Sequence, residues 1–148
     1  MYKRQPSAYR VAKVDSNFVW IRKDIETGSV NLFVSRYNDE YRRKVIQIRD
    51  SLSKRYIPGP IEGSFMSTDL IYEPNTEEIN IRGKQLLETR GLWEISGQFM
   101  AGPFLNYLLK IENEKDEYIM LDGFVYSPGS NKRDYVFELE AIMRSLKY

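Results

Sequence analysis

The sequence of 148 residues contains no cysteine and no histidine. Without cysteine, the chain can form no disulfide, thiolate nucleophile or cysteine metal site. Without histidine, it lacks the commonest general base near neutral pH and the commonest ligand of transition metals. Nucleophilic or acid–base catalysis would therefore have to use serine with lysine, or paired carboxylates.

The sequence also lacks a strong charge of either sign and long apolar runs. Lys and Arg number 22 against 21 Asp and Glu, a formal net charge of +1. This balance gives no general attraction to nucleic acid or to an anionic membrane. The apolar runs are too short to cross a bilayer, and the first ten residues hold no apolar signal core. The length and the hydrophobic share of 42% predict a single globular domain over residues 1–148.

Two stretches have the apolar spacing of amphipathic helices, in which apolar residues recur at intervals of three or four. These positions are Tyr41, Val45, Ile48 and Leu52 in the first stretch, and Tyr135, Leu139, Ile142 and Leu146 in the second. Each position in the second stretch follows its counterpart by the same number of residues. The constant offset indicates an internal repeat, although two unrelated amphipathic helices could also match by chance.

Strand-like segments precede each helix, and polar turns separate them. They are 8–14, 17–24 and 29–35 in the first half, and 84–95, 103–111 and 117–126 in the second. We therefore predict an α+β fold in which an antiparallel sheet of about six strands carries two helices on one face. The two βββα units would span about 8–56 and 84–148, joined by an irregular segment, 57–83.

Alternation along the strands assigns their side chains to faces of the sheet. We expect the more apolar sets to lie under the helices. They are Leu87, Thr89, Gly91, Trp93 and Ile95; Leu105, Tyr107, Leu109 and Ile111; and Ile119, Leu121, Gly123 and Val125. A glycine inside a strand usually marks a bulge or a close approach. Gly91 and Gly123 are therefore predicted to make room for bulky neighbours.

The opposite face mixes large aromatic side chains with isolated charges, which is unusual for a surface exposed to water. Its main residues are Trp20, Phe33, Arg90, Phe104, Asp122, Phe124 and Tyr126. Either segment 57–83 or another domain covers this face, or the seven residues form a site for a ligand or partner. The cover by 57–83 would use Ile61, Phe65, Met66, Leu70, Ile71 and Tyr72. Asp122 is expected to form an ion pair with Arg90 on a neighbouring strand, and a role as general acid or base is the alternative.

Three blocks of sequence resemble a known family. They are KRYIPGPIEGSFMSTD (54–69), ETRGLWEISGQFMAGPF (88–104) and DGFVYSPGSNKRDYVFELEAI (122–142), and NFVWIRKD (17–24) fits as well. The family is a domain of unknown function in bacteria, and its members are mostly predicted lipoproteins of Gram-negative species. Family members are usually longer, with a signal peptide, a lipid-bearing cysteine and an additional N-terminal half, so this chain resembles their C-terminal half.

The resemblance implies a location in the cell envelope, on the periplasmic side. Contact with the membrane would require a lipid anchor that this chain does not contain. The partner would be the N-terminal half of a longer chain or another envelope protein. The resemblance implies no reaction.

Three functions remain open at this stage. The first is a non-catalytic envelope domain with a binding or structural role. The second is an enzyme that uses carboxylates, and the third is a protein that stacks single-stranded nucleic acid on the aromatic face. Acidic residues on that face argue against the third, so no nucleic-acid partner is expected. We expect no cofactor or metal, because the sequence contains neither a phosphate-binding glycine loop nor an EF-hand spacing.

Overall fold

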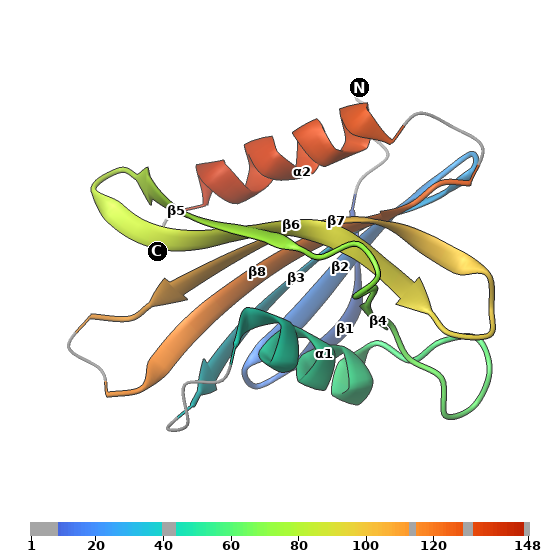
Figure 1. Cartoon of the computed structure of the whole chain (residues 1–148), viewed down its shortest axis with the longest axis horizontal. Helices are drawn as coiled ribbons and strands as arrows, with labels where there is room; N and C mark the ends of the chain where they lie inside the picture. The colour runs from blue at the N-terminus through green and yellow to red at the C-terminus, as the bar shows by residue number, and fades with distance from the viewer. Residues whose placement is uncertain (1–8, 40–43, 113–114, 129–131, 147–148) are drawn as a thin grey trace.

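A computed structural model describes residues 9–39, 44–112, 115–128 and 132–146 of the chain (Figure 1). The described part contains eight strands and two helices. In chain order they are β1 (Arg10–Asp15), β2 (Phe18–Ile25), β3 (Gly28–Asn38), α1 (Val45–Tyr56), β4 (Ser67–Thr68), β5 (Asn75–Ile81), β6 (Lys84–Ile95), β7 (Met100–Lys110), β8 (Glu117–Tyr126) and α2 (Arg133–Ser145).

All eight strands belong to one antiparallel sheet. The order across the sheet is β1-β2-β3-β8-β7-β6, and β4 and β5 pair with different parts of the outer edge of β6. Two meanders, β1-β2-β3 and β6-β7-β8, therefore meet where β3 pairs with β8. The prediction of an antiparallel α+β fold is confirmed, but the prediction of about six strands is wrong, because segment 57–83 contributes β4 and β5.

The two helices lie on opposite faces of the sheet (Figure 1). Ile48 of α1 belongs to a core that also contains Phe33 and Phe104. Leu139 of α2 belongs to a second core, with Leu121 on the other side of the sheet. The prediction of two helices on one face is therefore wrong. The physical reason is that both faces of the central strands are apolar, so each face needs a helical cover.

The predicted repeat of two βββα units does not describe the structure well. A helix follows three strands in each half, but α1 and α2 cover opposite faces. The halves are therefore not two copies of one packing unit. The helix position Tyr41, on which part of the match depended, lies outside the described residues.

The face assignment is correct for β7 and β8. Leu109, Leu121 and Val125 lie in the core beneath α2, as expected. A Cβ atom added to Gly123 would lie 3.0 Å from Leu139 Cδ1. Gly123 therefore makes room for a bulky helix side chain, as predicted.

The face assignment of β6 is wrong. Gly91 pairs with Phe104, and a Cβ atom added to Gly91 would lie 2.8 Å from the Phe104 ring. Trp93 belongs to the core on the same face, beneath α1. Gly91 does make room for a bulky neighbour, but that neighbour lies on the face opposite α2.

Neither helix in the described ranges combines the length and the apolar character that crossing a membrane requires.

Candidate functional site

The aromatic face of the sheet is covered by α1 and by the chain that follows it. Phe33, Phe104 and Phe124 are buried. They share one core with Ile57 and Met66 of the covering segment. This cover matches part of one predicted alternative, in which segment 57–83 packs over the aromatic residues.

The rest of the predicted cover points outward. Of the six side chains expected to form it, Met66 is buried, Phe65 is half-buried, and the other four are exposed. The exposed four are Ile61, Leu70, Ile71 and Tyr72. Helix α1, which was not expected on this face, supplies the missing cover.

The seven residues predicted as a binding site do not form one surface. Trp20 and Tyr126 are half-buried at the margin of the aromatic core, and Trp20 Nε1 donates a hydrogen bond to Asn31 Oδ1 (3.0 Å). The three phenylalanines and Asp122 are buried. Arg90 lies on the opposite face, where it contacts Glu140 of α2.

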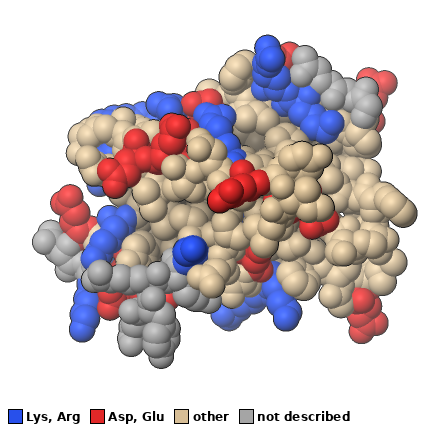
Figure 2. All heavy atoms as spheres, viewed as in Figure 1, with Lys and Arg blue, Asp and Glu red and all other residues tan. Residues whose placement is uncertain are grey.

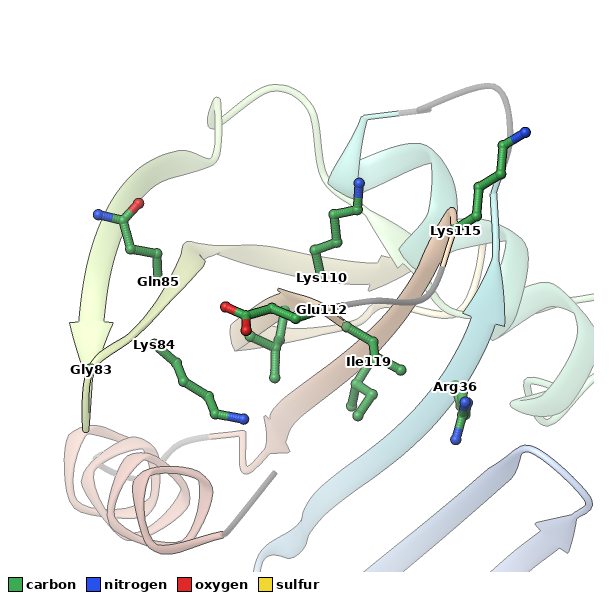
Figure 3. Close-up of a pocket in the computed structure, with 10 residues that line it drawn as sticks. Arg36, Gly83, Lys84, Gln85, Lys110, Glu112, Lys115 and Ile119 are labelled. Atoms are coloured by element: carbon green, nitrogen blue, oxygen red, sulfur yellow. The ribbon is translucent and has the colours of Figure 1, made fainter.

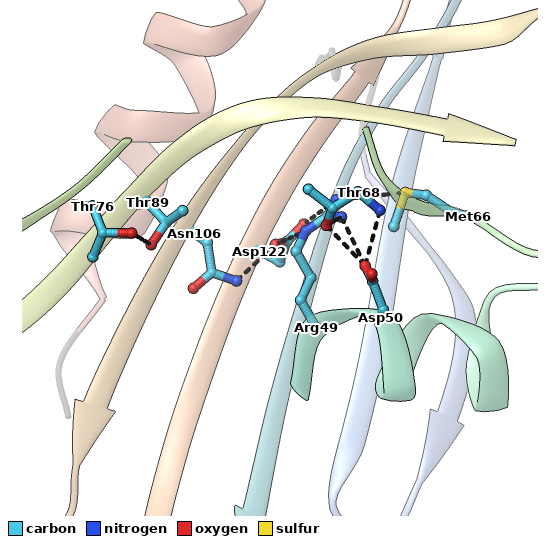
Figure 4. A network of polar contacts seen from close by, with 8 residues as sticks. All are labelled: Arg49, Asp50, Met66, Thr68, Thr76, Thr89, Asn106 and Asp122. Carbon is cyan, nitrogen blue, oxygen red and sulfur yellow. Dashed lines mark hydrogen bonds and ion pairs between the residues drawn. The ribbon is translucent and has the colours of Figure 1, made fainter. Parts of the chain in front are cut away.

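Asp122 forms an ion pair with Arg49 of α1, and not with Arg90 (Figure 4). Arg49 Nε donates to Asp122 Oδ2 over 2.6 Å, and both side chains are 0% exposed. Asn106 Nδ2 donates to the same carboxylate oxygen over 2.7 Å. The guanidinium carbon of Arg49 also lies 3.8 Å from the centre of the Phe104 ring. The predicted pair with Arg90 is wrong because the register of β6 turns Arg90 to the other face of the sheet.

The same arginine connects α1 to the short strand β4. Arg49 Nη1 donates to Thr68 Oγ1 (3.1 Å), and Thr68 donates its hydroxyl and backbone N–H to Asp50 Oδ1 (2.8 and 2.9 Å). Figure 4 shows these groups as one chain of contacts between α1, β4 and β8. The network fixes where α1 and β4 sit on the sheet.

The chemistry of the network is structural. Burial raises the pKa of the Asp122 carboxyl, although Arg49 and Asn106 act in the opposite direction. A carboxylate that is 0% exposed and accepts hydrogen bonds from both Arg49 and Asn106 cannot meet a substrate. The sequence did contain a signal for this pair, because Arg49 follows Val45 by four residues and so lies on the apolar face of the helix.

A second feature is an open hollow at the end of the sheet where the β5–β6 and β7–β8 turns lie (Figure 3). Its volume is about 980 Å³, in the range of small-molecule sites. Leu109, Ile111 and Ile119 form its apolar part. Sequence reasoning missed the hollow, because its walls come from β3, β6, β7 and β8 and meet only in the folded chain.

The charged lining of the hollow is mainly basic. In the part of the chain that the structure describes, this lining contains Arg36, Lys84, Lys110, Lys115 and one acid, Glu112. Lys84 reaches from the β5–β6 turn toward the wall that carries Arg36, whereas Lys110 and Lys115 extend outward (Figure 3). Arg36 is paired with Glu117, with Nη2 and Oε2 2.7 Å apart. The excess of positive charge favours an anionic group at this rim.

Within the described residues, no group of three or more acidic side chains is arranged to hold a metal ion. Three features characterise the described structure: a sheet covered on both faces, a buried ion pair that holds α1, and an open basic hollow with an apolar floor.

The fold and these features define an α+β domain built on one antiparallel sheet. The chain belongs to the family described as Domain of unknown function (DUF4837), which matches residues 3–145. No curated protein matches the sequence.

Proposed function

We propose that this chain is a non-catalytic binding domain of the bacterial cell envelope and that the hollow is its binding site. One observation carries the proposal. An open hollow of about 980 Å³ combines an apolar floor with a charged rim, and its described lining residues include four basic side chains, of which Arg36 is paired with Glu117, and one acidic side chain. A site of this kind suits a ligand group that is anionic at one end and apolar at the other.

The apolar floor contributes binding free energy that surface charge alone does not supply. Leu109 is buried, and Ile111 and Ile119 are half-buried, so a ligand in the hollow would remove further apolar area from water. Each CH₂ group buried in this way contributes about 0.8 kcal/mol. The basic side chains would orient the ligand, because exposed charges contribute more to direction and rate than to affinity.

The carboxylate-based enzyme has less support. Asp122, the acid that interrupts an apolar strand, is buried and paired with Arg49. Among the described residues that line the hollow, Glu112 is the one carboxylate, whereas acid–base hydrolysis by carboxylates uses two.

The nucleic-acid hypothesis depended on exposed aromatic rings. Phe33, Phe104 and Phe124 are buried beneath α1 and the segment that follows it. They therefore offer no faces on which bases could stack.

The envelope location is supported by the resemblance of the sequence blocks to predicted lipoproteins. In longer relatives, a lipid anchor and an additional N-terminal half would hold this domain at the membrane. The domain would there present the hollow to an amphipathic molecule or to a protein.

The binding site can be tested with decyl phosphate, kept well below its micellar concentration, and followed by amide NMR shifts. We expect shifts that saturate and that centre on residues 83–85, 109–112 and 119. Inorganic phosphate lacks the apolar chain and decanol lacks the anionic group, so each should bind about tenfold more weakly or worse than decyl phosphate. Lys84→Glu should weaken decyl phosphate binding severalfold, whereas Lys13→Glu on the exposed strand β1 is the matched control. Shifts spread over the surface, or equal effects of the two variants, would contradict the proposal.

A further inference from the structure

An apolar loop protrudes from the edge of the sheet between β4 and β5. Asp69 bonds to Leu92 on β6 (N···O 2.8 Å), and Asn75 pairs with Arg90 on the same strand. Five residues, 70–74, therefore connect two contacts that are separated on β6 only by Gly91. Because five residues are too many for so short a distance, the chain loops outward. Leu70, Ile71 and Tyr72 form its tip and are 67%, 87% and 64% exposed.

The base of this loop is held in place. Ile71 donates its backbone N–H to Asp69 Oδ1 (2.9 Å). Pro74 packs at Gly91, where an added Cβ atom would lie 3.1 Å from Pro74 Cβ. A loop fixed at its base loses less conformational entropy when it binds. Three adjacent large apolar side chains on such a loop are characteristic of an interaction site.

The surroundings of the tip are acidic. Glu73 follows the tip directly and is exposed, as is Glu77 near the start of β5. Figure 2 shows a group of acidic side chains near the middle of this view, with basic side chains next to it. The occupant that fits this surface is therefore a concave apolar site with a basic rim. The hollow described above has both properties.

The loop cannot reach the hollow of its own chain. Gly91 opposes the loop, and Lys84 at the hollow lies seven residues along the same strand. At about 3.3 Å per residue, this separation is roughly 23 Å. Because both ends of the loop are held on β6, the two surfaces can meet only between molecules.

We propose that the loop tip of one molecule, Leu70-Ile71-Tyr72-Glu73, binds in the basic hollow of a second copy of this chain. The inference rests on the proposed function, because it uses the same hollow as a binding site. The apolar tip contacts Leu109, Ile111 and Ile119, and Glu73 faces the basic rim. Since the two surfaces are different parts of the molecule, the contact is head-to-tail and each dimer keeps one free tip and one free hollow.

The test is the mean mass of the full chain, measured by sedimentation equilibrium over increasing concentrations. We expect the mass to rise beyond that of a dimer and to fall at high salt. Tip variant Ile71→Asp and hollow variant Lys84→Glu/Lys110→Glu should each stay monomeric. A mixture of the two should form dimers and nothing larger, because only one productive contact can form. Phe137→Asp, at an exposed apolar position on α2, is the matched control and should associate like the parent.

A parent chain that stays monomeric at all concentrations would overturn the inference. So would variants that associate as the parent does, or a mixture that remains monomeric. If the parent is monomeric but binds decyl phosphate in the hollow, the inference fails and the proposed ligand site stands. If the mixture forms dimers but decyl phosphate does not bind, the hollow recognises protein, and the amphipathic ligand is the proposal that fails.

Discussion

Arg49 of α1 and Asp122 of β8 lie 73 residues apart in the sequence and form a hydrogen-bonded ion pair of 2.6 Å in the interior. Buried pairs of this kind contribute little net stability, since both ions lose their hydration. Their effect is on position, because any other placement of α1 would leave the buried Asp122 carboxylate without its cationic partner. The pair therefore specifies which face of the sheet α1 covers.

Removing one ion of this pair should be costly. Asp122→Asn keeps the volume of the side chain but leaves the buried Arg49 with Asp50, 3.8 Å away, as its remaining acidic partner, and we expect a loss of about 3 kcal/mol in the free energy of unfolding. Arg49→Met combined with Asp122→Asn should lose less than Asp122→Asn alone. Urea unfolding followed by tryptophan fluorescence measures the double variant and the two single variants, Asp122→Asn and Arg49→Met. Simple addition of the two single effects would show that the ions do not act as a pair.

Two glycines in neighbouring strands should differ in their tolerance of alanine. A Cβ atom on Gly102 would lie 2.0 Å from the backbone oxygen of Val125, which also accepts a hydrogen bond from Trp93 Nε1. A Cβ atom on Gly123 meets only the Leu139 side chain, at 3.0 Å. We expect Gly123→Ala to cost about 1 kcal/mol and Gly102→Ala clearly more, since overpacking costs about 1–3 kcal/mol. Thermal melts of the two variants provide the comparison, and the reverse order would contradict the packing described for β7.

The two tryptophans should contribute unequally to stability. Trp93 is buried in the core beneath α1, and Trp93→Ala should cost about 3–5 kcal/mol. Trp20 is half-buried at the margin of the same core, so Trp20→Ala should cost less. Chemical denaturation followed by circular dichroism avoids the loss of the fluorescent probe. Equal losses would mean that Trp20 is as deeply packed as Trp93.

Glu138 should contribute to acid sensitivity. Partial burial acts to raise the pKa of Glu138, but hydrogen bonds from Lys23 and Tyr9 outweigh it and lower this pKa below the usual value. Because the folded pKa lies below the unfolded one, the stabilisation is present above the unfolded pKa and is lost as the pH falls through the folded pKa. Glu138→Gln should therefore lower the melting temperature at pH 7, and the difference from the parent should shrink at low pH. Glu26→Gln, at an exposed site, should show no such trend.

The sequence was sufficient to predict the type of sheet and the faces of β7 and β8. Alternation placed Leu109 and Leu121 beneath a helix correctly, because only the opposite side of these largely apolar strands also carries the polar residues Asn106 and Asp122. Alternation failed for β6, because the set that contains Gly91 and Trp93 has the same apolar character as the sets that lie beneath α2. The face of β6 depends on its register with β7, in which Gly91 pairs with Phe104, and single-strand alternation contains no information about register.

The placement of α1 depended on a long-range contact. Asp122, an aspartate inside an apolar strand, was predicted to have a charged partner, whereas Arg49 on the apolar face of its helix was not singled out. Nothing local to either segment identifies Arg49 as the partner of Asp122, because Arg90 was an equally reasonable choice. The hollow could not be predicted for a similar reason, since Arg36 and Lys84 come from strands that are not neighbours.

The pairing of β3 with β8 has a consequence for how the chain folds. Each meander can form from contacts between neighbouring segments. The pairing of Leu32 with Gly123, in contrast, joins residues that are separated by most of the chain. Closing so long a connection is entropically unfavourable until the pairing is made, and proteins dominated by such contacts fold slowly. We therefore expect the pairing of β3 with β8 to limit the folding rate, after each three-stranded meander has formed.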